Sequence, residues 1–151
     1  MNSPLMKSFG ESRVKDGESV VVVDLAGCIG MDSTFMGTLA GMASKLSAVD
    51  GGALQIAEAD ERNRRSLEDL GLDFLMQINP DGAEWKDRLE EIRACLEPAQ
   101  AGDAPNQLDR ARHVLQAHED LSDISDENAA EFRTVVGTLK KQVSDESQSE
   151  S

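Results

Sequence analysis

Four consecutive valines at positions 20–23 constrain the fold of this chain more than any other feature of its sequence. β-branched residues favour extended backbone, and an uninterrupted apolar run is typical of a strand buried on both faces within a parallel sheet. We therefore expect a strand over residues 20–25, ended by glycines at 27 and 30. The chain is predicted to be an α/β protein built around this strand.

A helix is predicted to follow the turn after the valine strand. Apolar side chains recur at three- and four-residue steps from Phe35 to Leu46, which is the pattern of an amphipathic helix. Asp32 and Ser33 precede this pattern, and both residue types are favoured N-caps. A serine hydroxyl is therefore expected at a helix N-terminus, where the helix dipole stabilises negative charge by about 0.3–1 kcal/mol at an exposed site.

The pair of Asp32 and Ser33 has two interpretations. In the first interpretation, both side chains are ordinary capping residues, and the spacing alone favours this interpretation. In the second, Ser33 accepts a phosphoryl group, which adds about 1.5–2 negative charges beside Asp32 and changes the surface potential strongly.

Further elements are predicted on either side of this segment. Ser3 and Pro4 favour a first helix that ends near residue 16. Residues 53–57 are predicted to form a second strand, parallel to the first. Asp60 is expected to cap a helix over residues 61–70, and the glycine after it to end that helix in a left-handed conformation.

Residues 72–78 are predicted to supply apolar packing and a short edge strand. Asp81 and Glu84 then have the spacing of a capping box. The helix that they begin carries Trp85 and further apolar residues on one face, so we expect it to cover the sheet with Trp85 in the core. This helix would close the first domain, which we place at residues 1–97.

The C-terminal third of the chain has a different pattern. Residues 98–106 have the composition of a linker, and residues 107–121 and 127–143 are amphipathic. These two segments are predicted to be helices that pair as a hairpin, dock onto the domain or a second copy, or bind a partner. An oligomer contact is expected to use them. The acidic residues 144–151 are predicted to be disordered.

Three motifs resemble the STAS domain family of bacterial anti-sigma factor antagonists, in the same order along roughly residues 3 to 96. Residues 31–39 (MDSTFMGTL), with the strand before them, resemble its phosphoacceptor segment. Residues 51–56 (GGALQI) resemble the next strand, and residues 64–72 (RRSLEDLGL) resemble the following helix. The family places strands before its first helix, so we expect a partial STAS-like sheet covered by helices. Either those strands are replaced in this chain, or the natural N-terminus lies upstream of Met1, and we favour the second alternative.

The resemblance assigns roles to one short segment. Ser33 would be the phosphoacceptor and Thr34 a second acceptor hydroxyl. The residues expected to bind a partner, or to form the core beneath it, are Met31, Asp32, Phe35, Met36, Gly37 and Thr38. Gly37 and Gly41 would let a neighbouring backbone approach closely. Alternatively, or at the same time, Gly37 would leave the face beside Ser33 bare for a kinase.

The resemblance implies a switch in protein binding. The unphosphorylated domain would bind an anti-sigma factor that is also a serine kinase, phosphorylation of Ser33 would block that binding, and a serine phosphatase would restore it. The alternative is a STAS-type scaffold in a signalling or transport assembly, whose Ser33 is never modified.

The charge of the chain disfavours two classes of binding partner. The 29 acidic and 15 basic residues give a net charge of −14, which disfavours nucleic acid and anionic membranes. The sequence shows neither a signal peptide nor an apolar run long enough to span a bilayer, so a cytoplasmic location is expected. The two cysteines are expected to be buried thiols.

An enzyme is disfavoured on the sequence. The Ser33 motif contains Asp32 but no histidine or lysine, and its glycines do not follow a phosphate-binding pattern. His113 and His118 lie in the C-terminal segment, five residues apart, and do not share one helix face squarely. Neither a metal nor a cofactor is expected.

Overall fold

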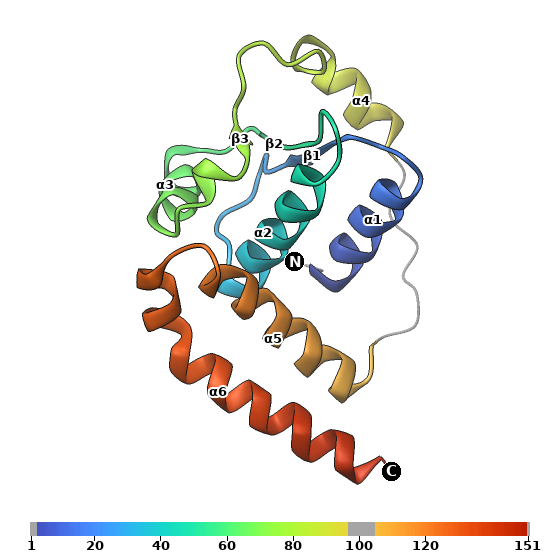
Figure 1. Ribbon diagram of the computed structural model, residues 1–151. Helices are drawn as coiled ribbons and strands as arrows, with labels where there is room; N and C mark the ends of the chain where they lie inside the picture. The colour runs from blue at the N-terminus through green and yellow to red at the C-terminus, as the bar shows by residue number, and fades with distance from the viewer. Residues whose placement is uncertain (1–2, 97–104, 151) are drawn as a thin grey trace.

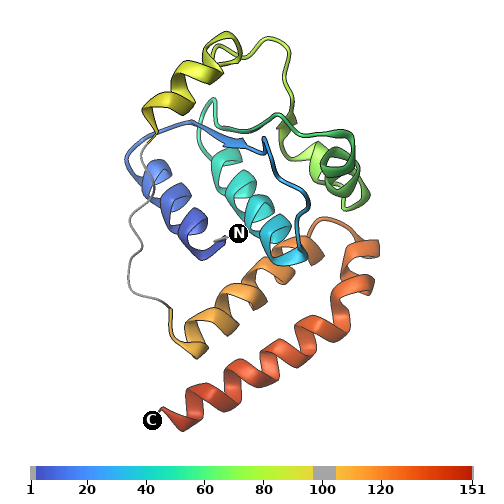
Figure 2. The same ribbon diagram turned by 180° about the vertical axis from the view of Figure 1, so that it is seen from behind.

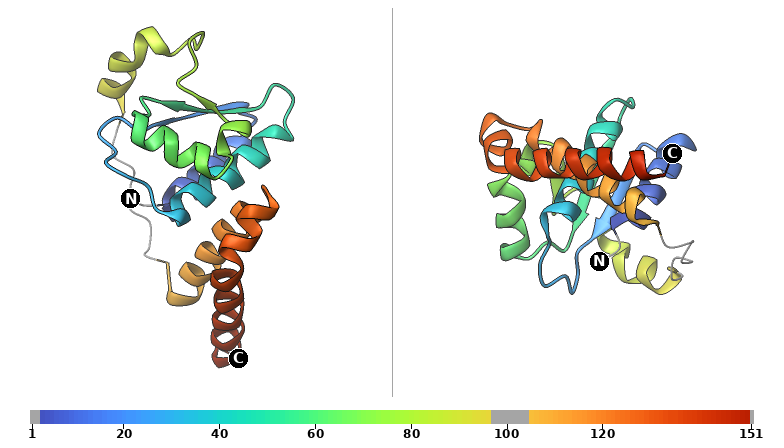
Figure 3. Two further views of the ribbon diagram at one scale, coloured as in Figure 1. Left: turned by 90° about the vertical axis from the view of Figure 1, so that its left-hand side faces the viewer. Right: turned by 90° about the horizontal axis from the view of Figure 1, so that it is seen from below.

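The computed structural model describes residues 3–96 and 105–150 as an α/β protein. The helices are α1 (Ser3–Lys15), α2 (Ser33–Ser47), α3 (Glu61–Asp69), α4 (Leu89–Cys95), α5 (Gln107–Ser122) and α6 (Asp126–Ser149), with two short 3-10 helices, η1 (Leu72–Phe74) and η2 (Lys86–Arg88). The strands are β1 (Val20–Asp24), β2 (Ala53–Ala57) and β3 (Gln77–Ile78). Figures 1 and 3 show three layers: the sheet, then α1, α2 and α3 on one side of it, then α5 and α6.

The three strands are parallel in the order β1-β2-β3, so the valine strand lies at an edge. The predicted strand is confirmed, but the prediction that both of its faces are buried is wrong. Val21 is buried, whereas Val20 and Val22 are 44% and 37% exposed. The reason is that α1 and α2 pack on one face of the sheet, and alternate residues of a strand point to opposite faces.

The core lies between the sheet and α2. Leu54 and Ile56 of the central strand β2 are at most 1% exposed and share one apolar cluster with Leu39 and Leu46 of α2. The parallel pairing of residues 53–57 with the valine strand is confirmed. At about 1.5–3 kcal/mol for each fully buried aliphatic side chain, this interface supplies much of the stability of the fold.

The predicted caps around α3 are also confirmed. The Asp60 carboxylate accepts a hydrogen bond of 2.7 Å from the Asn63 backbone N–H. Gly71 follows α3 with a φ of 73°, in the left-handed region that glycine adopts without steric cost. The predicted short edge strand is β3, at residues 77–78.

The helix expected to cover the sheet does not do so. η2 and the seven-residue α4 stand in its place, and α4 buries none of its residues. Trp85 is only half-buried, and its indole N–H donates to the Gln55 side chain over 2.6 Å. Gln55 also donates to Gln77 across the strands, so this part of the uncovered face offers hydrogen bonds beside the exposed valines. The prediction that Trp85 lies in the core is therefore wrong.

The two C-terminal segments form a helical hairpin, and this hairpin packs against α2. Pairing as a hairpin and docking onto the domain were both among the predicted alternatives. Figures 1 and 2 show α5 running across the N-terminal end of α2, with α6 on the outside. Residues 98–104 of the predicted linker lie outside the described residues, and Asn106 caps α5. In the described ranges, no helix is long and apolar enough to cross a membrane.

The prediction that residues 144–151 are disordered is wrong for most of the segment, because α6 continues to Ser149. Polar contacts hold this last part in the helix. Glu146 accepts hydrogen bonds of 2.9 Å from Gln142 one turn earlier and from Gln107 at the start of α5. The Ser147 hydroxyl donates to the Val143 carbonyl.

Candidate functional site

Ser33 is the first residue of α2, at the end of the loop that follows β1. Asp32 is the N-cap, and its carboxylate accepts a hydrogen bond of 2.8 Å from the backbone N–H of Phe35. The buried Asn63 holds the preceding loop by donating to the Cys28 carbonyl over 2.8 Å. The predicted placement of a serine hydroxyl at a helix N-terminus, beyond the carboxyl end of a strand, is confirmed.

The hydroxyl of Ser33 meets His118, a buried residue of α5 that lies 85 positions away in the sequence. Ser33 Oγ and His118 Nε2 are 2.9 Å apart. His118 Nδ1 lies 2.7 Å from the Val114 carbonyl oxygen. Because a carbonyl oxygen only accepts, Nδ1 carries a ring hydrogen, and in the neutral imidazole Nε2 is left to accept the hydrogen bond that the Ser33 hydroxyl donates.

His118 is the residue that the sequence analysis missed. The sequence places it on the apolar stripe of α5, where a histidine is a weak signal of a site. Its ring packs against Phe132 of α6 in a T-shaped arrangement, with 5.5 Å between the ring centroids. The hairpin therefore fixes the ring that binds Ser33.

A second histidine of α5 makes a similar contact one turn away. His113 Nε2 lies 3.0 Å from the Ser3 hydroxyl and 3.5 Å from the Thr38 hydroxyl. Burial lowers the pKa of His113, and the positive charge of Lys7 lowers it further. His113 is thus held in its neutral form between α1, α2 and α5.

Two glycines let α5 approach the backbone of α2. A Cβ atom at Gly37 would overlap the Ala117 carbonyl group, and one at Gly41 would lie 2.5 Å from the Asp120 carboxylate. Close backbone approach, one of the two readings of these glycines, accounts for Gly37. The other reading, a bare face beside Ser33, does not describe this structure, because Ala117 covers that face.

The residues predicted to bind a partner divide into three groups. Phe35 and Met36 are part of the apolar core. Gly37 and Thr38 are buried, and both contact α5. The remainder are more accessible: Asp32 is exposed, and Met31, Ser33 and Thr34 are half-buried. Four of the predicted contact residues are therefore not available on the surface of this structure.

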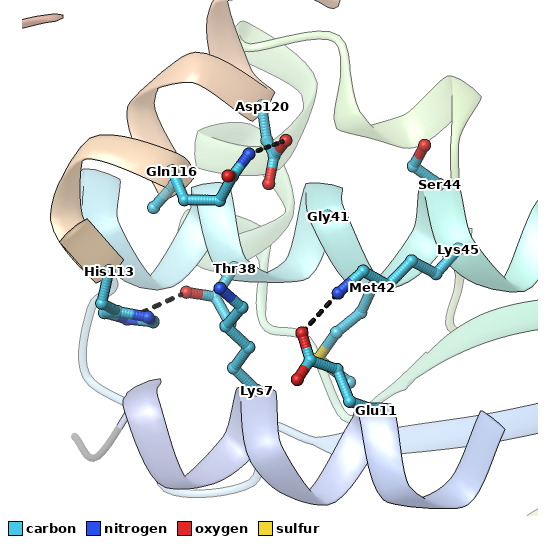
Figure 4. A pocket seen from close by; sticks show the side chains of 11 residues that line it. Lys7, Glu11, Thr38, Gly41, Met42, Ser44, Lys45, His113, Gln116 and Asp120 are labelled. Carbon is cyan, nitrogen blue, oxygen red and sulfur yellow. Dashed lines mark hydrogen bonds and ion pairs between the residues drawn. The ribbon is translucent and has the colours of Figure 1, made fainter. Parts of the chain in front are cut away.

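A polar cavity of about 380 Å³ lies where α1, α2 and α5 meet (Figure 4). Asp120 and His113 line it from α5, facing Lys7 of α1. Burial raises the pKa of Asp120, although a hydrogen bond from Gln116 acts in the opposite direction. On the far side, Lys45 pairs with Glu11. The junction between α5 and the rest of the molecule thus contains charged groups and open volume.

This arrangement holds the Ser33 oxygen in one hydrogen bond and partly beneath α5. A neutral imidazole that accepts from a hydroxyl has the geometry of a base beside a nucleophile. Its other nitrogen, however, bonds to a backbone carbonyl and not to a carboxylate. Among residues 3–96 and 105–150, histidine, cysteine and acidic side chains form no group of three suited to a metal ion.

Comparisons with known proteins add no relative. No protein-family model, no curated protein and no solved structure matches this chain. The resemblance carried by the motifs around Ser33 therefore stays a prediction.

Proposed function

We propose that this protein is a phosphorylation-controlled protein-binding switch, similar to the anti-sigma factor antagonists of the STAS family. Its partner would be an anti-sigma factor that acts as a serine kinase, with a serine phosphatase reversing the modification in the cytoplasm. The observation that carries the proposal is the position of Ser33, which begins α2 directly after its capping residue Asp32. This is the place that the family's phosphoacceptor motif assigns to its serine.

The chemistry of the switch is electrostatic. The kinase would transfer the terminal phosphoryl group of a nucleoside triphosphate to Ser33 Oγ. The new P–O bond replaces the anhydride bond, and the hydroxyl proton leaves. The product carries about 1.5–2 negative charges beside Asp32, at a surface where a protein partner must exclude water. Repulsion and the cost of removing water from the phosphoryl group would then reject that partner.

The proposal assigns no catalytic role to Ser33. His118 is its neighbour, and the arrangement lacks the acidic residue that orients the base of a catalytic triad. The alternative function is a STAS-type scaffold with a permanently unmodified serine. The hydrogen bond that already occupies the Ser33 hydroxyl favours this alternative.

Two measurements separate these functions. Intact-mass spectrometry of the protein from its native host, with and without phosphatase treatment, should reveal a phosphorylated species that maps to Ser33. In affinity capture from the same host, Ser33→Asp should lose a partner that Ser33→Ala retains. Ser12→Asp, which adds a carboxylate at an exposed position of α1, is the matched control and should also retain it. An unmodified protein under all growth conditions, with equal capture by both Ser33 variants, would support the scaffold.

A further inference from the structure

The surface that the proposed partner would use is already occupied by part of the same chain. Gly37 and Thr38 are buried against α5, and Ser33 donates its hydrogen bond to α5. We propose that the α5–α6 hairpin is a detachable cover of the N-terminal half of α2, and that a phosphoryl group on Ser33 releases it. This inference rests on the proposed function only for the identity of the phosphorylated residue.

The first argument is the direction of one hydrogen bond. Ser33 donates and His118 Nε2 accepts, because Nδ1 is committed to the Val114 carbonyl. A phosphoryl group on Oγ removes the hydrogen of the hydroxyl and presents oxygen atoms that only accept. Acceptors would then face each other at a partly buried contact, which costs more than the loss of the hydrogen bond alone.

The second argument is space. The backbone of α5 lies so close to α2 that the Ala117 carbonyl leaves no room for a methyl group at Gly37. The His118 ring lies at hydrogen-bond distance from Ser33 Oγ and also packs against Phe132. A phosphoryl group needs several ångströms beyond Oγ, so it requires α5 to move away.

The third argument is that the cover has few large apolar anchors. Of the six residues that α5 buries, two are histidines, two are alanines and two are leucines. α6 buries only Asn128 and Phe132. Of the buried residues of the hairpin, only Leu121 and Phe132 reach the apolar cluster that α2 shares with the sheet. The cavity beside His113 and Asp120 lies within the same junction. Segments with few buried apolar contacts are those that open locally while the rest of a protein stays folded.

The N-terminal half of α2 can then bind either the hairpin of the same chain or the partner protein, but not both at once. The partner must displace the hairpin before it can reach the covered residues Gly37 and Thr38, which lowers its apparent affinity by the fraction of open molecules. Once Ser33 is phosphorylated, the charge excludes both occupants and the hairpin stays released. Its buried face, with Leu108, Leu121 and Phe132, is then exposed.

Hydrogen exchange tests the release on the full-length protein, with phosphoserine incorporated at position 33 during synthesis. Exchange of α5 amides should accelerate at least about tenfold relative to the unmodified protein, while β2 amides change by less than about twofold. Phosphoserine at Ser12, an exposed residue of α1, is the matched control and should leave α5 unchanged. Gly37→Ala should accelerate exchange in α5 without any phosphoryl group.

Three results would overturn the inference. Unchanged protection of α5 would show that the phosphoryl group fits beneath it, and increased protection would show that a protonated His118 binds it. An equal loss of protection in α5 and β2 would show that the hairpin and the sheet unfold together. Because the phosphoserine is installed during synthesis, none of these results depends on whether Ser33 is phosphorylated in the native host.

Discussion

Helix α2 has two interfaces, and they differ in kind. Toward the sheet, Leu39 and Leu46 pack against Leu54 and Ile56, and all four side chains are at most 1% exposed. Toward the hairpin, α2 presents small and hydroxylated residues, and α5 contributes buried histidines, alanines and leucines, with a carboxylate beside a cavity. Leu121 and Phe132 of the hairpin join the apolar cluster of the core. One helix thus carries an apolar face that builds the core and a second face on which hydrogen bonds and small residues are mixed with a few apolar contacts.

The two interfaces of α2 therefore have different roles: the one with the sheet stabilises the fold, and the one with the hairpin carries the candidate site. Apolar contacts are strong and non-directional, so separating α2 from the sheet requires a large free energy. Contacts through hydroxyls and imidazoles contribute about 0.5–1.5 kcal/mol each and respond to charge and to pH. A site that opens is expected at an interface of hydroxyls and imidazoles, and Ser33 lies at such an interface, between α2 and the hairpin.

The largest expected effect comes from the core. Leu54→Ala should lower the free energy of unfolding by about 2–5 kcal/mol, because it leaves a cavity at a completely buried position of β2. Urea unfolding followed by circular dichroism measures this loss, which should affect the whole chain. Val135→Ala, at a position of α6 that is 40% exposed, is the control and should stay within about 0.5 kcal/mol of the parent.

Gly37→Ala should act on the hairpin alone. The added methyl group overlaps the Ala117 carbonyl, so we expect undocking of α5 to become easier by about 1–3 kcal/mol, with the sheet still folded. Protease cleavage within the hairpin, compared with cleavage within the domain, measures the difference. Gly137→Ala replaces a helical glycine with nothing within 4 Å of the new atom and should stabilise α6 slightly. Equal resistance to cleavage in all three proteins would contradict a strained contact at Gly37.

Asn128 links the hairpin to the domain. Its side-chain amide donates to the Leu70 carbonyl over 2.9 Å and to the Leu121 carbonyl over 3.0 Å. Asn128→Ala should therefore weaken docking by about 1–3 kcal/mol, since it leaves buried carbonyls without these donors. NMR chemical shifts of α3 and α5 should change together in this variant, and shifts in β1 should not. Changes in β1 of the same size would argue against a separable hairpin.

The smallest effect is expected from acidification. Burial and Lys7 lower the pKa of His113 in the docked state, so protonation favours the open state. Docking is complete above the ordinary histidine pKa of about 6.5 and should be lost progressively as the pH falls below it. Asp120 acts in the opposite sense, because its pKa is raised and its burial becomes less costly at low pH.

Substitutions isolate the histidine in that titration. In Asp120→Asn, the protection factors of α5 amides, which correct for the slower intrinsic exchange at low pH, should fall on acidification, with no opposing contribution from the carboxylate. In the double variant Asp120→Asn with His113→Gln, this fall in protection should disappear. If both proteins respond equally to pH, another group controls docking.

The local structure around Ser33 could be predicted from the sequence, because it depends on short-range chemistry. The strand, the cap at Asp32 and the start of α2 each follow from residues within a few positions. The partner of Ser33 could not be predicted in the same way, since His118 comes from a helix 85 positions away whose docking depends on tertiary packing.

The other errors have similar causes. Val20 and Val22 are exposed because burial depends on which elements cover each face of the sheet. Trp85 donates a hydrogen bond to Gln55 on the uncovered face of the sheet. The apolar pattern of the residues after Trp85 did not show that this face carries polar side chains. The acidic C-terminus stays helical because Gln107, from the neighbouring helix, donates to Glu146.

Native-state hydrogen exchange of the unmodified, full-length protein tests most directly whether the hairpin is separable. Across low concentrations of denaturant, amides of α5 should exchange through an opening that requires less free energy and exposes less surface than the opening that frees β1 and β2. That result would establish a state in which Ser33 is uncovered while the sheet is intact. If amides of α5 and β2 instead open with the same free energy and the same dependence on denaturant, the hairpin is a permanent part of the core and not a cover.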